Sequence, residues 1–160
     1  MPDQPLILLV EDREDDIVVI RKAFQRARIS TALQVVRDGE EAIHYLDGVG
    51  KFSHRSEYPL PWLVLLDLKM PRVDGFEVLK WIRRHPTLRS LVVVVFTSSE
   101  QTRDVNECYA LGANSFMVKP LDFENSVALA GLLHQYWVHY NHFGKTERGP
   151  LREMNGNTEA

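Results

Sequence analysis

The stretch Leu63-Val64-Leu65-Leu66-Asp67 decides the fold of this 160-residue chain. It is a short apolar run of strand length that ends abruptly in a carboxylate. Three further runs end in polar residues: Leu6–Val10 before Glu11 and Asp12, 91–96 before Thr97, and Ser115–Val118 before Lys119 and Pro120. Because the carboxyl ends of parallel strands meet at one edge of a sheet, we expect these polar side chains to converge.

Helix-length amphipathic segments separate the strand-length runs. We expect strands at 6–10, 33–36, 63–66, 91–96 and 115–118, with helices at 13–28, from 39, at 75–85, at 100–111 and at 122–140. Alternation of this kind predicts an α/β fold, a doubly wound five-stranded parallel sheet. Right-handed crossovers then place helices on both faces of the sheet.

The composition is that of a globular protein, with 44% hydrophobic and 26% charged residues. The net charge of −3 gives no reason to expect nucleic acid as a partner. No run approaches the roughly 20 apolar residues of a membrane span, and the N-terminus lacks the basic region of a signal peptide. A single cysteine, Cys108, fits a reducing compartment, so we expect a cytoplasmic protein. We predict one domain over 1–140 and a flexible tail over 141–160.

Glu11, Asp12 and Asp67 are candidate ligands of Mg²⁺, which prefers hard oxygen donors. Two carboxylates about 4 Å apart repel each other by about 4 kcal/mol at an effective dielectric near 20, and a dication relieves that repulsion. Taken alone, the acids at 11 and 12 are equally consistent with the acid-rich start of a helix, because Glu14, Asp15 and Asp16 follow.

Asp67 is harder to explain as a surface residue, because it directly ends an apolar strand. A carboxylate can attack phosphorus and form an acyl phosphate. Lys119 could neutralise the phosphoryl oxygens and Thr97 could donate its hydroxyl to one of them. In isolation, Lys119 is better explained as a surface lysine and Thr97 as a helix cap. Their joint spacing with the acids is what favours the site.

The sequence resembles the receiver domain of two-component response regulators. The resemblance covers residues 6–140 and rests on Glu11-Asp12, Thr97-Ser98, Lys119-Pro120 and above all the stretch from Asp67 to Gly75. It implies the flavodoxin-like strand order 2-1-3-4-5. It also implies a phosphoacceptor protein rather than an enzyme with a separate substrate.

By this resemblance, Asp67 receives a phosphoryl group from a histidine kinase. Glu11, Asp12, Asp67 and the backbone carbonyl of Lys69 would hold Mg²⁺, while Thr97 and Lys119 would contact the phosphoryl oxygens. Glu11 stands where the family more often has aspartate. Phe116 takes the place of the aromatic switch residue that responds when Thr97 moves, and the Lys119–Pro120 bond is usually cis in the family.

No output domain follows the predicted last helix, so we expect a single-domain regulator that signals through protein contacts. Tyr136, Trp137 and Tyr140 are candidate anchors of a homodimer formed by helix four, strand five and helix five; alternatively, their rings cover the end of the domain. The long 47–62 segment and the Tyr136-Trp137 pair resemble regulators paired with bacterial phytochromes. This implies a bacteriophytochrome histidine kinase as partner.

Two other functions remain as alternatives. A haloacid-dehalogenase-type phosphatase also uses a strand-end aspartate and Mg²⁺, but it needs a second aspartate where this chain has Lys69. A receiver-like scaffold that is never phosphorylated is the other alternative. The six histidines form no convincing metal site, and Cys108 is expected to be an inert packed thiol.

Overall fold

The computed structural model describes residues 4–143. Five parallel strands form one sheet in the order β2-β1-β3-β4-β5. Their bounds are β1 Leu6–Val10, β2 Ala32–Val36, β3 Leu63–Leu66, β4 Val92–Thr97 and β5 Ser115–Val118. The predicted fold class and the strand order 2-1-3-4-5 are therefore confirmed.

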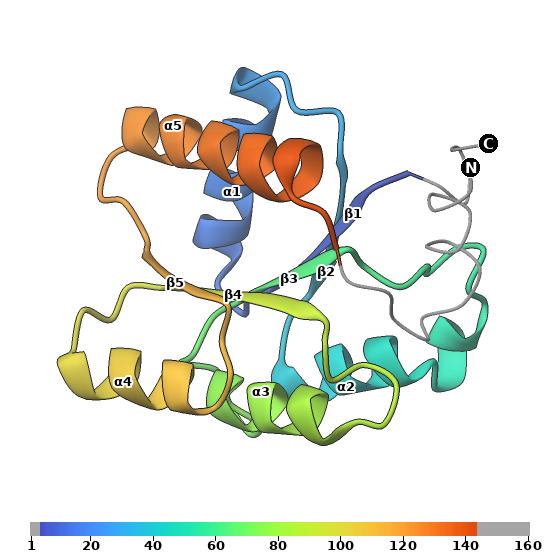
Figure 1. Cartoon of the computed structure of the whole chain (residues 1–160). Coiled ribbons are helices and arrows are strands. Elements are labelled where there is room, and N and C mark those ends of the chain that lie inside the picture. Colours follow the sequence, from blue (N-terminus) through green and yellow to red (C-terminus); the bar gives the residue numbers. More distant parts are fainter. Residues whose placement is uncertain (1–3, 144–160) are drawn as a thin grey trace.

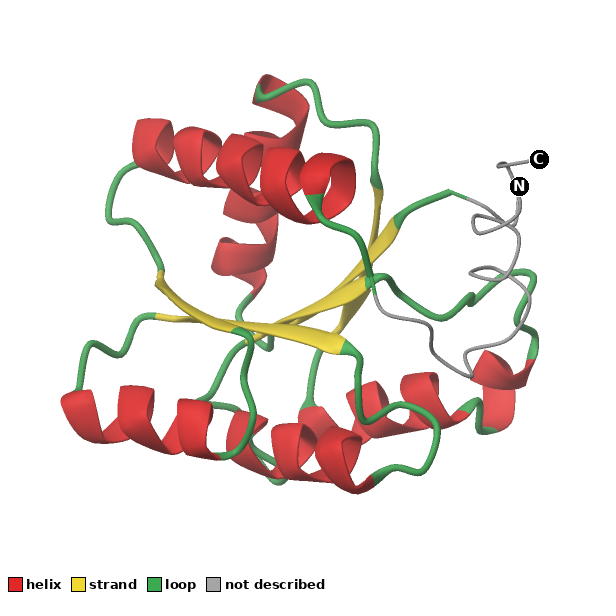
Figure 2. Ribbon diagram, viewed as in Figure 1, coloured by secondary structure: helices red, strands yellow, loops and turns green. Residues whose placement is uncertain are grey.

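Helices cover both faces of the sheet (Figures 1 and 2). On one face lie α1 (Glu14–Arg26) and α5 (Phe123–Leu133), and on the other lie α2 (Gly39–Asp47), α3 (Gly75–Arg84) and α4 (Thr102–Ala110). β1 and β3 are buried along their whole length, which explains why their sequences are continuously apolar rather than alternating.

The apolar core lies in two main layers, one on each side of the sheet. Ile17, Phe24 and Leu133 from α1 and α5 pack on alternate residues of β1 and β3. On the opposite side, Leu79 and Ile82 of α3 lie in the other layer. The central strands are thus sandwiched between the helices, and their carboxyl ends are held rigidly.

Gly75 brings the start of α3 against the backbone of Asp67. A Cβ atom at position 75 would lie 2.2 Å from the Asp67 carbonyl oxygen, so only glycine fits there. The Gly75 amide donates a 2.9 Å hydrogen bond to the Leu68 carbonyl. Asp74 caps the same helix by accepting from the Glu77 amide. The loop that carries Asp67 is therefore fixed from both sides.

The long connection between α2 and β3 is packed against the domain. It contains a short 3₁₀ helix, η1 (Gly50–Ser53). The Arg55 guanidinium donates to the carbonyls of Tyr45, Leu46 and Tyr58. Hydrogen bonds from a charged donor to several carbonyls explain how a segment of this length stays ordered.

The last helical segment ends at Tyr140, as predicted, but it is not a uniform α-helix. The α-helix α5 ends at Leu133 and continues as a π-helix, η2 (His134–Tyr140), after which the Asn141 amide donates a hydrogen bond to the Tyr136 carbonyl. Trp137 and Val138 of η2 pack on the core beneath α1 and α5.

The cis Lys119–Pro120 bond expected from the family resemblance was wrong. The bond is trans, since residues 4–143 contain no cis peptide, and trans is the lower-energy isomer of a free X-Pro bond. Residues 144–160 of the predicted tail lie outside the described part of the chain.

Candidate metal and phosphoacceptor site

The structure brings Glu11, Asp12 and Asp67 together at the carboxyl ends of β1 and β3. One carboxylate oxygen from each residue lies within 4.8 Å of the other two. Backbone hydrogen bonds extend the sheet to these positions, because the Asp67 amide donates to Val10 and the Glu11 amide donates to Val36. The apolar strands thus aim three acids at one point, as their spacing predicted.

Glu11 is fully buried, with 0% of its surface exposed. Burial raises its pKa to about 7, and the negative charge of Asp67 adds to this rise. A hydrogen bond from Lys119 and one from the Arg13 amide oppose the rise. The raised pKa means that the site disfavours the negative charge of Glu11, so a positive charge beside this carboxylate would be stabilising.

Asp12 carries a buried carboxylate oxygen, Oδ1, that has no hydrogen-bond partner. A buried charged oxygen without a partner is costly, so such an atom indicates a group that binds there. Three carboxylates converging on one point match the donor set of a hard divalent cation. The residues present therefore fit such a cation.

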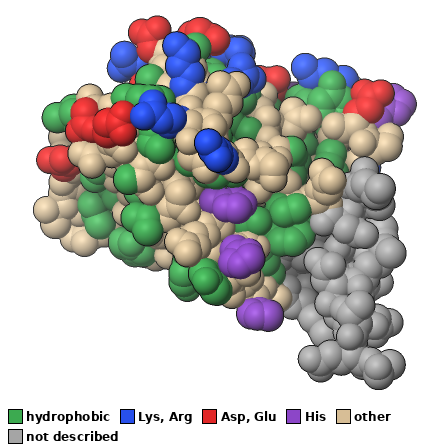
Figure 3. Space-filling view, turned by 90° about the horizontal axis from the view of Figure 1, so that it is seen from above, with side chains coloured by type: hydrophobic (Ala, Val, Ile, Leu, Met, Phe, Trp, Pro, Cys, Tyr) green, Lys and Arg blue, Asp and Glu red, His purple; other side chains and the backbone are tan. Residues whose placement is uncertain are grey.

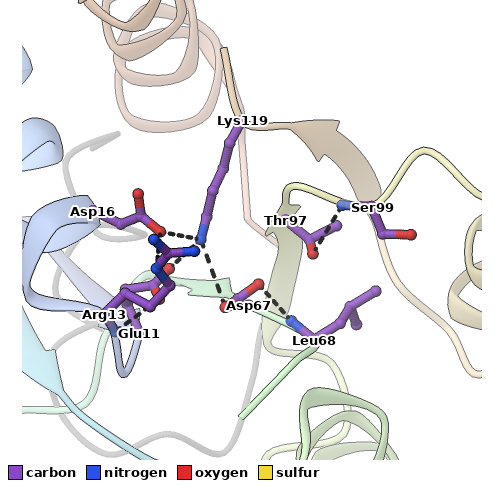
Figure 4. A network of polar contacts seen from close by, with 8 residues as sticks. All are labelled: Glu11, Arg13, Asp16, Asp67, Leu68, Thr97, Ser99 and Lys119. Atoms are coloured by element: carbon purple, nitrogen blue, oxygen red, sulfur yellow. Dashed lines mark hydrogen bonds and ion pairs between the residues drawn. The ribbon is translucent and has the colours of Figure 1, made fainter. Parts of the chain in front are cut away.

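Lys119 reaches over the acids from the end of β5 (Figure 4). Its Nζ lies 2.5 Å from Glu11 Oε2, 3.0 Å from Asp16 Oδ2 and 3.6 Å from Asp67 Oδ2. Burial alone would lower the pKa of Lys119, but the hydrogen bond to Glu11 and the charge of Asp67 raise it overall. The ammonium is thus a fixed positive charge beside Asp67.

The Asp67 carboxylate is almost completely buried, with 4% of the residue exposed. Its Oδ1 accepts a 2.9 Å hydrogen bond from the Leu68 amide, and its Oδ2 faces Lys119. The two oxygens therefore have different surroundings, and the orientation of the carboxylate is fixed.

Thr97 is fully buried at the end of β4, the strand next to β3. Its hydroxyl oxygen accepts a 3.4 Å contact from the Ser99 amide, and Figure 4 shows it across Asp67 from Lys119. The Ser99 hydroxyl donates to Asp104 at 2.6 Å, which fixes the loop after β4. A hydroxyl and an ammonium thus flank the Asp67 carboxylate.

Phe116, the predicted switch residue, is half-buried in β5. It packs against a small cluster of Leu68, Val95 and Cys108. Leu68 directly follows Asp67, so this cluster connects Phe116 to the site. Burial, together with nearby acidic groups, raises the pKa of Cys108 to about 12, in keeping with an inert thiol.

The three aromatic residues predicted at an interface differ in exposure. Tyr136 and Tyr140 are exposed, by 58% and 62%, whereas Trp137 is half-buried against the core of its own domain. Leu132, one turn earlier, is also exposed. Figure 3, a view onto the α1 and α5 side, shows acidic and basic side chains gathered away from the lower edge, where histidine and uncharged side chains lie.

Sequence reasoning missed Asp16, which contacts Lys119 directly. It lies in the acid-rich first turn of α1, where acids are common for helix stability alone. The predicted Lys69 is exposed, and the role of its carbonyl stays a prediction. Among residues 4–143, no group of three or more histidine, cysteine or acidic side chains other than Glu11, Asp12 and Asp67 could hold a metal.

Residues 7–130 match the response regulator receiver domain family. The chain belongs to this family. It is 38% identical over 142 residues to the probable methanogenesis regulatory protein FilR2 of Methanothrix harundinacea, covering 87% of each chain. It is 32% identical over 133 residues to response regulator Rcp1 of Synechocystis, covering 83% of this chain and 88% of Rcp1.

Solved structures of phytochrome-associated regulators have the same fold. Response regulator RPA3017, in red light signalling of R. palustris, has a TM-score of 0.84 at 36% identity and covers 89% of this receiver and 99% of its own chain. The phosphorylated cyanobacterial phytochrome response regulator RcpA has a TM-score of 0.81 at 31% identity, with the same coverage. Rcp1 in its Mn²⁺-bound form has a TM-score of 0.78 at 30% identity, covering 88% and 99%.

The Mn²⁺-bound relative and the acidic cluster of this receiver together fit a divalent metal at the carboxyl edge of the sheet. Within the described range 4–143, no helix has the length and apolar character to cross a bilayer.

Proposed function

We propose that this receiver takes a phosphoryl group onto Asp67 from a phosphohistidine of a histidine kinase. The observation that carries the proposal is the pairing of a buried, oriented carboxylate with a fixed ammonium 3.6 Å away, beside two further acids. A phosphorylated relative of the same fold, RcpA, supports it.

In the proposed step, an Asp67 oxygen attacks phosphorus in line with the histidine nitrogen. The phosphorus–nitrogen bond breaks as the new phosphorus–oxygen bond forms, and the imidazole leaves with the electron pair and gains a proton. Lys119 stabilises the charge on the transferred oxygens and Thr97 donates its hydroxyl to one of them. Glu11, Asp12, Asp67 and the Lys69 carbonyl would hold Mg²⁺, which supplies further positive charge there.

Labelling with a small phosphodonor tests this function. We expect acetyl phosphate with Mg²⁺ to add one phosphoryl group per chain, measured by intact mass, and we expect EDTA to prevent the addition. Absence of labelling would favour a phosphorylation-independent scaffold. Continuous turnover of a phosphomonoester would instead favour a Mg²⁺-dependent phosphatase.

The Asp12→Asn substitution is expected to weaken Mg²⁺ binding at least about tenfold, because it removes one charge from the oxygen set that includes the orphaned Oδ1. Isothermal titration calorimetry measures the affinity. Asp15→Asn is the matched control: it removes the same charge, but from an exposed residue in the first turn of α1. Equal affinities in the two variants would contradict the assignment of Asp12.

The phosphodonor that we propose is a bacteriophytochrome histidine kinase in the cytoplasm. The proposal rests on relatives whose names refer to red light signalling and to a phytochrome. Transfer from a phosphorylated bacteriophytochrome kinase should be at least about tenfold faster than transfer from an unrelated histidine kinase. Equal rates from both kinases would contradict it.

We also propose a homodimer through α4, β5 and α5, with Tyr136 and Tyr140 as anchors. Trp137, which packs against the core, contacts the Tyr136 ring. The Tyr136 and Trp137 rings meet edge to face at 4.9 Å, which fixes Tyr136 in an exposed position. Exposed aromatic residues held in place lose little entropy on association.

Tyr136→Ser is expected to weaken this dimer about thirtyfold, as loss of an interface anchor does. Light scattering across a dilution series measures the change. The matched control is Gln135→Ser, an exposed neighbour on the same π-helix. A wild-type protein that stays monomeric at every concentration would rule out the proposed dimer.

A further inference from the structure

Asp16 lies at the edge of the site but outside the group of acids suited to a metal. Its Oδ2 accepts a 3.0 Å hydrogen bond from Lys119 Nζ, and Arg13 Nε lies 3.7 Å from the same oxygen (Figure 4). No role in phosphotransfer requires this carboxylate, so its contact with Lys119 needs an explanation.

The Lys119 ammonium has three protons to donate. Glu11 and Asp16 accept from it at hydrogen-bond distance, whereas Asp67 Oδ2, at 3.6 Å, lies beyond that distance. In this arrangement the ammonium is held nearer to Asp16 than to the carboxylate that is to be phosphorylated.

Glu11 and Asp16 differ in whether they remain available to Lys119 when a divalent cation is bound. Glu11 belongs to the metal-suited group, so a bound divalent cation would compete with Lys119 for its oxygens. Asp16 does not belong to that group and keeps its charge available to Lys119. Once the cation is bound, Asp16 is therefore the remaining anion that holds the ammonium away from a phosphoryl group on Asp67.

We propose that Asp16 is a positioning residue that holds the Lys119 ammonium in the unphosphorylated protein and competes with the phosphoryl group for it. This inference rests on the proposed phosphorylation of Asp67. This competition opposes phosphorylation, so Asp16 lowers the rate at which Asp67 takes up the phosphoryl group.

Asp16→Asn is expected to raise the rate of labelling by acetyl phosphate, at saturating Mg²⁺, about threefold, the size of effect of a partly exposed ion pair. Asp15→Asn, which removes the same charge from an exposed position in the same helical turn, should leave the rate unchanged. A rate that is unchanged or lower in Asp16→Asn overturns the proposal, and so does an equal increase in both variants.

A double-mutant cycle separates positioning from a general effect of charge. In a Lys119→Ala background, Asp16→Asn should no longer change the labelling rate, because the group on which it acts is gone. A threefold increase that persists without Lys119 would show that Asp16 acts through its own charge and would overturn the positioning role.

A third measurement does not depend on phosphorylation. Without Mg²⁺, the ammonium NMR signal of Lys119 should be visible in the wild type, because hydrogen bonds slow its exchange with water. It should shift or broaden in Asp16→Asn and stay unchanged in Asp15→Asn. If the Lys119 signal is unchanged in Asp16→Asn, the pairing of Lys119 with Asp16 is overturned. If the wild type takes up no phosphoryl label, the proposed function is contradicted instead.

Discussion

The Asp67→Asn variant is expected to take up less than about one hundredth of the phosphoryl label of the wild type, because an amide cannot act as the nucleophile. Its fold should be unaffected. The asparagine oxygen can keep the hydrogen bond from the Leu68 amide, and Lys119 keeps Glu11 and Asp16 as partners. Intact mass after exposure to acetyl phosphate measures the label, and thermal melting measures the fold.

Asp74→Asn is the matched control for this substitution. Asp74 lies on the same loop and caps α3, and asparagine caps helices as well as aspartate does. We expect wild-type labelling in this control. Retention of the label by Asp67→Asn would mean that another residue is the acceptor.

The Lys119→Ala variant is expected to lose about 3 kcal/mol of unfolding free energy in the absence of Mg²⁺. Glu11 and Lys119 form a nearly buried pair, with side chains 0% and 11% exposed, and removal of one partner leaves a buried charge uncompensated. Denaturant unfolding should be measured well above pH 7, because Lys119 lowers the pKa of Glu11 and its removal raises that pKa further above the wild-type value of about 7. Below that pH, protonation of Glu11 reduces the loss, because the neutral acid needs no counter-ion.

Saturating Mg²⁺ should recover most of that stability, because a divalent cation replaces the missing positive charge among the acids. Lys22→Ala, which truncates an exposed lysine of α1, is the control and should change the unfolding free energy little. If Lys119→Ala were equally destabilised with and without Mg²⁺, the acids would not form a metal site.

Much of the fold can be predicted from the apolar runs of strand length in the sequence. The apolar runs at Leu6–Val10 and Leu63–Leu66 are buried on both faces, and the observed strands have the predicted bounds there. The acids that follow them converge because parallel strands must end at the same edge. Local pattern and topology together were therefore sufficient to predict the place of Glu11, Asp12 and Asp67.

Other features depend on contacts that no local pattern encodes. Asp16 and Lys119 are 103 positions apart, and the acids at the start of α1 look alike in the sequence. The π-helix after Leu133, from which Trp137 packs against the core, is also not predicted by an α-helical period. Likewise, the carbonyls that order the 47–62 segment around Arg55 are brought together only by the fold.

The most direct test of the central claim is to locate the phosphoryl group on the chain. The protein is labelled with acetyl phosphate and Mg²⁺, reduced with borohydride, which converts an acyl phosphate to an alcohol, digested, and sequenced by mass spectrometry. We predict that the reduced side chain lies at Asp67 and that EDTA abolishes it. Reduction at any other aspartate or glutamate, or labelling that persists in EDTA, would contradict the account.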